Sequence, residues 1–438
     1  MFNILVHRLE IYILQEEKNH MKIGSKIRFH RLKQKLTQEN LSKGIISISY
    51  LSKLENNQVT PSDDIVHLLC ERLGLNHPVY RPNQLNELLE KWNHALLWNK
   101  EDEARSTHKL IQRDLDQTDD VSSHFFYKIL CFRVQLLRGD LTEAFSHLSH
   151  IQTNYKDLSD KHKFYFHKYK GNYYYLMKEY EKAKGELKEA ETYFVLGNVV
   201  NEEERADLFY LFSLVLTRLH MYRLAIYYGE KALSIFQGVY YQKRCAEVHL
   251  LLGICYRRIR NGEDAVKHYE WANFISQSIQ YTSLHSKIEQ NFGYLKSFMN
   301  KSDEAIQHFV RSIELKESDD EGKLYSILSL VKEHYKLNQR SEVQFWLSKG
   351  LELCSKERYP DKFYQLSYYQ FALNEFLNGF EYFMKECALP YFKKNGSLLL
   401  YAEYSKFLGQ YYQRIRKYKL AAFHLNESNI IYEEMLPL

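Results

Sequence analysis

The densest group of chemically active side chains is a run of basic residues near the start of the chain. Residues 21–60 contain eight lysines and arginines against two glutamates, whereas residues 61–438 are neutral in sum. Such a cluster is the electrostatic footprint expected of contacts to a DNA phosphate backbone. A solvated surface is the alternative, which the helix pattern described below makes less favoured. The eight cations are Lys22, Lys26, Arg28, Arg31, Lys33, Lys35, Lys43 and Lys53.

Residues able to do catalytic or metal chemistry occur, but without the spacing that such chemistry needs. The sequence contains no HExxH, Walker, GxGxxG or GxSxG motif. Two histidine pairs, at 147/150 and 162/167, lack a third ligand at metal-binding spacing, and the acidic residues 319–321 lack the alternating oxygens of a calcium loop. We therefore expect no enzyme, no metal and no other cofactor.

The composition predicts an all-α chain. Its 438 residues exceed one ordinary core, and they include only 17 Gly and 6 Pro beside 36 Tyr and 25 Phe. Six cysteines without a CxxC pair are typical of reduced thiols in a cytoplasmic protein. No apolar run reaches the roughly 18 residues of a membrane span, and we expect no membrane partner. Residues 1–20 make a poor signal peptide, and we interpret them as an extension or an upstream start-site artefact.

Residues 21–75 predict four short helices with a tight turn between the second and the third. Thr37 and Ser47 are expected to cap these two helices, because their hydroxyls can accept from free amides of the first turn. A fourth helix starts at Ser62 and stops at Gly74. This arrangement predicts a helix-turn-helix DNA-binding domain. Its inward-facing residues are expected to include Leu32, Leu41, Leu51, Leu54, Leu68, Leu69 and Leu73.

The same stretch resembles the Xre-type (Cro/C1-like) helix-turn-helix family. The elements TQEN-L, S-x-S-Y-L-S-K-L-E and PS-x-x-x-x-x-L follow in the family's order between Ile23 and Leu75. One departure is the turn LSKGIIS, which is one residue shorter than usual and displaces its glycine to Gly44. A shortened turn also resembles the peptide-regulated branch of these regulators.

The third helix of such a domain enters the major groove of DNA. Gln38 resembles the family's phosphate-clamping glutamine, and Asn56 lies where the helix end nears the opposite backbone. Ser47 could instead act only as a cap, and Tyr50 could pack on the first helix. The predicted DNA-contacting residues are Gln38, Ser47, Ser49, Tyr50, Lys53 and Asn56.

The region 85–438 repeats a unit of about 40 residues, and a proline-containing linker at 76–84 precedes it. Glycines recur twelve residues before several of its anchors, as at Gly171 and Gly253. The pattern resembles a stretched tetratricopeptide repeat, and about nine units would stack into a right-handed solenoid with one concave face. The anchors are small residues that open the second helix of each pair: Ala104, Ala144, Ala183, Ala225, Ala265, Ala305, Val343 and Ala421, with a degenerate unit near Tyr382.

Polar residues on the first helix of each pair are candidates for holding an extended peptide. Asn and Gln side chains can donate to and accept from a peptide backbone, Arg and Lys can bind its carboxylate, and Tyr provides flat walls. The predicted peptide-binding residues, expected to face outward into the groove, are Arg133, Lys168, Asn172, Tyr175, Arg257, Gln290, Asn291 and Tyr294.

Together, the two regions resemble the RRNPP superfamily of quorum-sensing regulators from Gram-positive bacteria, and most of all its NprR- and PlcR-type members. The resemblance implies a cytoplasmic, dimeric or tetrameric transcription factor on a palindromic DNA operator. It also implies a short signalling oligopeptide in the 85–438 groove that changes oligomerisation. An alternative stays open: a repeat adaptor that sequesters a response regulator of the sporulation phosphorelay until the peptide releases it.

Overall fold

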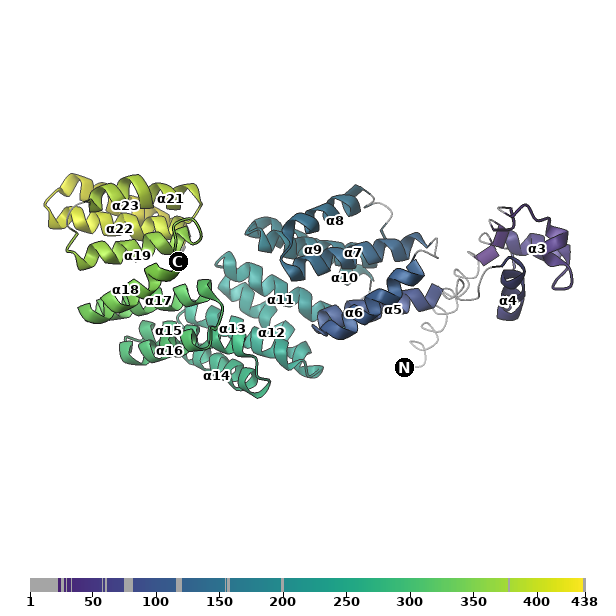
Figure 1. Ribbon diagram of the computed structural model, residues 1–438, viewed down its shortest axis with the longest axis horizontal. Helices are drawn as coiled ribbons and strands as arrows, with labels where there is room; N and C mark the ends of the chain where they lie inside the picture. Colours follow the sequence, from purple (N-terminus) through teal and green to yellow (C-terminus); the bar gives the residue numbers. More distant parts are fainter. Residues whose placement is uncertain are drawn as a thin grey trace. The chain divides into compact units, whose positions relative to one another are not determined.

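The computed structural model forms two compact units, Met1–Ser159 and Asp160–Leu438. Regular secondary structure in the described residues is entirely helical, which confirms the all-α prediction (Figure 1). The predicted extension, residues 1–20, lies outside the described part, as does most of the predicted linker. The structure describes residues 23–24, 27–28, 30–32, 34–56, 58–59, 61–74, 82–115, 120–153, 155, 158–197, 201–376 and 379–435.

The helix-turn-helix region contains α2 (Gln38–Ser42), α3 (Ile48–Glu55) and α4 (Asp63–Arg72). Both predicted caps are confirmed, since the Thr37 hydroxyl accepts from the amide of Asn40 and the Ser47 hydroxyl from that of Tyr50. Gly44 has a φ of 76°, a left-handed conformation that glycine adopts without steric cost. The displaced glycine is therefore the residue that lets the chain turn between α2 and α3.

The small core of this region matches most of the predicted inward face. Ile27, Leu41, Leu51, Leu54, Leu69 and Leu73 form one buried cluster. Two predictions are wrong: Leu32 and Leu68 are 56% and 45% exposed. Successive helical residues lie about 100° apart, so α4 buries Leu69 and Leu73, one turn apart, and turns Leu68 outward.

Two helix pairs complete the first unit. They are α5 (Pro82–Leu97) with α6 (Glu101–Leu115), and α7 (Val121–Arg138) with α8 (Leu141–Thr153). Helix α5 begins at a proline, which suits the first helical turn because its missing amide would have no helical partner there. Residues 82–84, predicted as linker, therefore belong to a helix.

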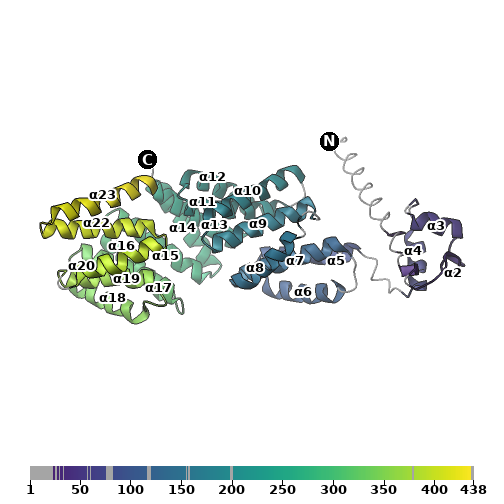
Figure 2. The same ribbon diagram turned by 90° about the horizontal axis from the view of Figure 1, so that it is seen from above.

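The second unit continues the same arrangement (Figure 2). Nine helix pairs follow one another in the described chain. The helices of this unit are α9 (Asp160–Leu176), α10 (Tyr180–Gly197), α11 (Glu202–Arg218), α12 (Tyr222–Gly238), α13 (Gln242–Arg258), α14 (Gly262–Ser278), α15 (Thr282–Phe298), α16 (Ser302–Glu314), α17 (Asp320–Lys336), α18 (Arg340–Leu353), α19 (Pro360–Leu373), α20 (Phe380–Tyr382), the π-helix η3 (Phe383–Ala388), α21 (Leu389–Lys394), α22 (Leu398–Arg414) and α23 (Tyr418–Met435). From α9 to α19 each helix packs on the next along the chain, and several first helices of successive pairs also touch, as α11 does with α13 and α17 with α19.

The 40-residue period has a simple local cause. Helices α11 to α15 contain 17 residues each, and the turns between them contain three. One residue in each turn is left-handed although it is not glycine, at His220, Tyr240, Arg260 and Gln280. Two such helices and two such turns span one repeat, so long helices rather than long loops stretch the unit.

The predicted anchors hold the helix pairs together. All eight anchor side chains are at most 9% exposed. At Gly253 a Cβ atom would lie 2.4 Å from the Tyr269 ring, and at Gly293 the same distance from Phe309. These glycines therefore let aromatic rings of the second helix touch the backbone of the first. The degenerate unit near Tyr382 is real: its second half is α20, η3 and α21, where Pro390 cannot donate a helical hydrogen bond.

One contact between the two helices of a pair is made by different residue types in different repeats. His167 of α9 meets Glu186 of α10, and Glu289 of α15 meets His308 of α16, at 2.7 Å in both cases. At the corresponding place in the α13–α14 pair, the Nδ1 atoms of His249 and His268 are 2.9 Å apart. Two imidazoles share one hydrogen bond only while at least one of them is neutral.

We expect the α13–α14 pair to be acid-sensitive. Burial, and then the neighbouring His268, lowers the pKa of His249 to about 4, so the unfolded chain binds its proton first as the pH falls. Stability should therefore fall between about pH 6.5 and pH 4, by up to about 3 kcal/mol from this group. Asp264, Lys267 and Glu230 also act on His268. Urea denaturation across this pH range measures the loss.

A matched variant separates this pair from other titrations. His268→Glu would place a carboxylate opposite His249, as Glu186 lies opposite His167. The carboxylate would stabilise the charged form of the His249 imidazole. The variant should lose less stability than the wild type on acidification. Identical pH profiles for the two proteins would contradict this role of the histidine pair.

Candidate functional site

The predicted DNA-contacting residues lie together on α3 and its flanks. Ser47, Ser49 and Lys53 are exposed, and Tyr50 is half-buried against the helix-turn-helix core. The Ser47 and Ser49 hydroxyls are 3.2 Å apart. The exposed face of α3 thus presents hydroxyl groups and one cation, which can meet base edges and phosphates.

A buried ion pair holds α3 in place. The Arg31 guanidinium donates to both carboxylate oxygens of Glu55, at 2.5 and 2.8 Å, and Glu55 is 2% exposed. The Nε2 of Gln38 donates to the same carboxylate at 2.8 Å. The hydrogen bond with Glu55 raises the pKa of Arg31. This contact joins the residues before α2, the start of α2 and the end of α3.

The ion pair removes one residue of the basic cluster from the cations available to a DNA phosphate. Arg31 was counted among eight phosphate-binding cations, but it is 8% exposed and committed to Glu55. Arg28 remains exposed and donates to the side chain of Asn56 at 3.1 Å. Lys35, Lys43 and Lys53 are exposed as well, while Lys22, Lys26 and Lys33 lie outside the described residues.

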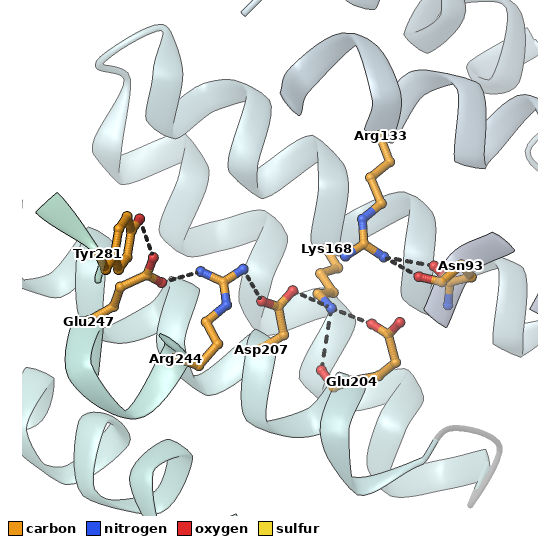
Figure 3. A network of polar contacts seen from close by, with 8 residues as sticks. All are labelled: Asn93, Arg133, Lys168, Glu204, Asp207, Arg244, Glu247 and Tyr281. Atoms are coloured by element: carbon orange, nitrogen blue, oxygen red, sulfur yellow. Dashed lines mark hydrogen bonds and ion pairs between the residues drawn. The ribbon is translucent and has the colours of Figure 1, made fainter. Parts of the chain in front are cut away.

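In the second unit, a chain of charged side chains crosses four consecutive first helices (Figure 3). Lys168 of α9 contacts Glu204 and Asp207 of α11 at 2.5 and 2.7 Å, and its side chain is fully buried. Arg244 of α13 continues the chain by contacting Asp207 at 3.1 Å. A buried ammonium requires such partners, because desolvating it alone is very costly.

The chain ends at α15. Arg244 also contacts Glu247 at 2.7 Å, and the Tyr281 hydroxyl donates to Glu247 at 3.0 Å. Burial opposes the charge on Arg244, but Asp207 and Glu247 outweigh it and raise its pKa. We call Lys168, Glu204, Asp207, Arg244, Glu247 and Tyr281 the inner ladder. It ties α9, α11, α13 and α15 together on one side of the solenoid.

Three predicted peptide-binding residues do not face outward as expected. Lys168 belongs to the inner ladder, and Arg133, in the first unit, is 5% exposed and donates to the Asn93 side chain at 2.8 Å. Gln290 is 7% exposed and donates to Ser329 at 3.1 Å. The polar atoms of these three side chains contact residues of the adjacent repeat. The three residues therefore hold neighbouring helices together.

The other predicted residues of the second unit keep accessible surface. Asn172, Tyr175, Arg257, Asn291 and Tyr294 are half-buried. The Arg257 guanidinium lies 5.6 Å from the centre of the Tyr294 ring, and the Tyr294 hydroxyl accepts from Ser329 at 3.4 Å. Arg257, Gln290 and Tyr294 are therefore linked in space, while Asn172 and Tyr175 share α9.

Two residues missed by the sequence reasoning, Arg218 and Tyr325, join this surface, and Lys362, which is 9% exposed, packs against Tyr325. Arg218 hydrogen-bonds to Tyr175, and burial raises the pKa of Tyr325 on α17, so its hydroxyl stays neutral. The Lys362 ammonium lies 3.4 Å from the centre of the Tyr325 ring. A search for cationic residues near the ends of first helices could have found Arg218, which lies seven residues before its anchor Ala225, one residue beyond the position that Arg257 occupies relative to Ala265.

Two negative findings concern the described residues alone. No three His, Cys, Asp or Glu side chains among them gather in a way that could hold a metal ion. None of their helices has the length and apolar character to cross a bilayer.

The fold and these surfaces define a class: a helix-turn-helix regulator with a helical-repeat domain. Residues 27–79 match the helix-turn-helix family model HTH_3. The transcriptional activator NprA of Geobacillus stearothermophilus is 36% identical over 391 residues, which cover 87% of this chain and 96% of NprA. The regulatory protein RapF of Bacillus subtilis is 24% identical over 362 residues, covering 78% of this chain and 93% of RapF.

Solved structures show the same fold. The apo quorum sensor NprR from B. thuringiensis superposes with a TM-score of 0.71 at 19% identity, covering 80% of this chain and 99% of that one. NprR bound to its cognate peptide NprX gives a TM-score of 0.63 at 20% identity, covering 81% and 98%. With the identity to NprA, these findings place the chain in a family. It belongs to the RRNPP family of regulators, together with NprA.

Proposed function

We propose that this protein is a cytoplasmic transcription regulator, not an enzyme, that binds DNA through α3 and a short signalling peptide through its repeat domain. One observation carries the proposal. A capped, exposed helix in a basic domain is joined in one chain to nine helix pairs, in a family that includes the transcriptional activator NprA. A free-standing repeat scaffold would have no use for such a helix.

The accessible residues of the second unit support the peptide part of the proposal. Asn172 and Asn291 can bond to a peptide backbone, and Arg257 beside Tyr294 offers a cation next to an aromatic wall. The relative NprR has been solved with its cognate peptide NprX. We assign peptide contacts here to Asn172, Tyr175, Arg257, Asn291 and Tyr294, and a positioning role to Lys168, Gln290 and Arg133.

Coupling between the two sites follows from symmetry. A dimer or tetramer carries two or more helix-turn-helix domains, and two half-sites of a palindromic operator lie about one helical turn of DNA apart. A peptide that binds one assembly better than another shifts the population of assemblies. It therefore decides whether two domains can reach both half-sites at once.

DNA binding should weaken steeply with salt. A dimer making about six to ten phosphate contacts loses roughly 10³–10⁵ in affinity between about 50 and 200 mM salt. Lys53→Ala should reduce the slope of log affinity against log salt by about 1 per subunit if the ammonium meets a phosphate. Fluorescence anisotropy with a labelled duplex measures both. Lys182→Ala, at an exposed position of α10, is the control and should leave the slope unchanged.

The peptide can be found without knowing its sequence. Mass spectrometry of the protein purified from its own cells, after acid release, should identify one retained oligopeptide. Asn291→Ala and Arg257→Ala should weaken binding of that peptide by roughly tenfold each, as expected for lost hydrogen bonds to a charged or backbone group. Retention of the peptide at full strength by both variants would contradict the assigned surface.

The response regulator aspartate phosphatase A of Bacillus subtilis is 24% identical to this chain over 274 residues. This weaker likeness favours a second candidate function, an adaptor that sequesters a response regulator of the sporulation phosphorelay. A pull-down and a DNA-binding assay distinguish the two functions. A pure adaptor would pull down a phosphotransfer protein in the absence of peptide and would bind no DNA sequence selectively. Selective DNA binding lost on substitution of α3 residues supports the transcription regulator.

A further inference from the structure

A cavity of about 520 Å³ lies in the first unit, and neither α3 nor any residue of the peptide surface assigned above contributes to its lining. Helices α5, α6 and α7 supply nearly all of its lining, and His147 of α8 adds one side chain. The volume falls within the roughly 300–1,000 Å³ typical of small-molecule sites. The cavity is partly open to solvent, so a ligand could enter it without any rearrangement of the helices.

One wall of the cavity is a cluster of three mutually packed rings, in which Trp92 is 3% exposed while His108 and Tyr127 are half-buried. The Trp92 and His108 ring centres are 4.6 Å apart at 27°, and those of His108 and Tyr127 are 5.8 Å apart at 4°. The Tyr127 hydroxyl hydrogen-bonds to His108 Nε2 at 3.1 Å, which fixes the imidazole. Ala95, Val134 and other apolar side chains complete the lining. The interior therefore suits a flat, apolar or aromatic body.

The charged residues of the lining are mainly positive. Lys100, Arg105 and Arg138 contribute cations against the single carboxylate of Glu101. Lys100 already contacts Glu103 at 3.4 Å. Arg105 and Arg138, in contrast, form no ion pair within the described residues. Burial, and then the charge of Arg138, lowers the pKa of His108, so this ring is neutral at pH 7.

We propose that this cavity binds a small carboxylate carried on an aromatic body. The ring would pack on the half-buried rings of His108 and Tyr127, which the buried Trp92 supports, and the carboxylate would meet the exposed Arg138 and Arg105. Arg105 and Arg138 are exposed to solvent and form no ion pair within the described residues, and a guanidinium can bind a planar carboxylate through two parallel hydrogen bonds. The inference is independent of the proposed peptide surface, which lies on the other unit.

Isothermal titration calorimetry of the full-length protein tests the proposal with a matched pair of probes. Indole-3-propionate should bind at least tenfold more tightly than indole-3-propionamide, which has the same shape but no charge. Arg138→Gln should lower the affinity for the acid to that for the amide and leave the amide unaffected. Arg113→Gln, an exposed α6 arginine outside the lining, should change neither.

A second variant tests whether the ligand needs the volume of the cavity. Val134→Phe should abolish binding of both probes while the circular dichroism spectrum and the melting temperature stay close to those of the wild type. If it unfolds the protein, Arg105→Gln provides the alternative test, with the same expectation as Arg138→Gln. Equal affinity for acid and amide, an unchanged preference in both arginine variants, or no binding of either probe at millimolar concentration would overturn the proposal.

The same experiment identifies the source of the carboxylate. A peptide Gly-Gly-Gly-Trp with a free C-terminus carries the same chemistry as indole-3-propionate. Tighter binding of the peptide would point to a peptide C-terminus as the natural ligand, and tighter binding of the small acid to a metabolite. Both results require the cavity and its arginines.

Discussion

Lys168→Met is expected to destabilise the second unit by roughly 3–5 kcal/mol, the usual cost of removing one partner from a buried ion pair. Methionine fills a similar volume, so the loss comes from removing the ammonium that Glu204 and Asp207 both contact, although Asp207 keeps its contact with Arg244. Glu204 and Asp207 have side chains that are 1% and 7% exposed, and neither can be solvated where it lies. Urea denaturation at pH 7, followed by circular dichroism, measures the change.

Two further variants show whether charge is the cause. Lys182→Met removes an ammonium that is 64% exposed and pairs with Glu179, and it should cost less than about 1 kcal/mol. Lys168→Met combined with Glu204→Gln and Asp207→Asn should recover part of the loss, because no charge is then buried alone. A loss as large in the triple variant would show instead that shape at position 168 matters most.

Glu55→Ala is expected to remove DNA binding while sparing the repeat domain. The substitution leaves the Arg31 guanidinium buried without its carboxylate and deprives Gln38 of its acceptor. Its cost, roughly 3–5 kcal/mol, is comparable to the whole stability that a core of this size supplies. The helix-turn-helix region should therefore be partly or wholly unfolded, and DNA affinity should fall at least roughly tenfold.

The control for this variant lies on the neighbouring helix. Glu71→Ala removes a carboxylate that is 69% exposed and whose contact with His67, at 4.0 Å, is weak. This substitution should leave DNA affinity unchanged. The main melting transition of the repeat domain should be the same in both variants. An unchanged DNA affinity in Glu55→Ala would show that the ion pair does not hold α3 in place.

The repeat architecture could be predicted because it depends on residue size. Small anchors such as Ala265 and glycines such as Gly253 allow two helices to approach, and these residues recur visibly at the repeat period. The caps Thr37 and Ser47 were predictable for a similar reason, since a cap bonds within three residues of itself. Features that depend on residue size or on bonds within a few residues can be predicted from a single sequence.

The burial of polar side chains could not be predicted in the same way, because their partners come from another repeat. Lys168 meets Glu204 36 residues later, and Gln290 meets Ser329 39 residues later. Each side chain alone resembles a groove residue on the exposed side of its helix. Comparison of opposite charges one repeat apart could have revealed the inner ladder. Arg31 was misjudged likewise, since Glu55 lies 24 residues away.

The central claim is that α3 reads DNA and that the repeat domain controls it through a peptide. Repeated selection of duplexes from a random DNA pool, by the full-length protein with and without its retained peptide, tests it most directly. We expect enrichment of one palindromic sequence in only one of the two states, and no enrichment by a variant carrying Ser49→Ala and Lys53→Ala. The same enrichment with and without peptide, or by that variant, would contradict it.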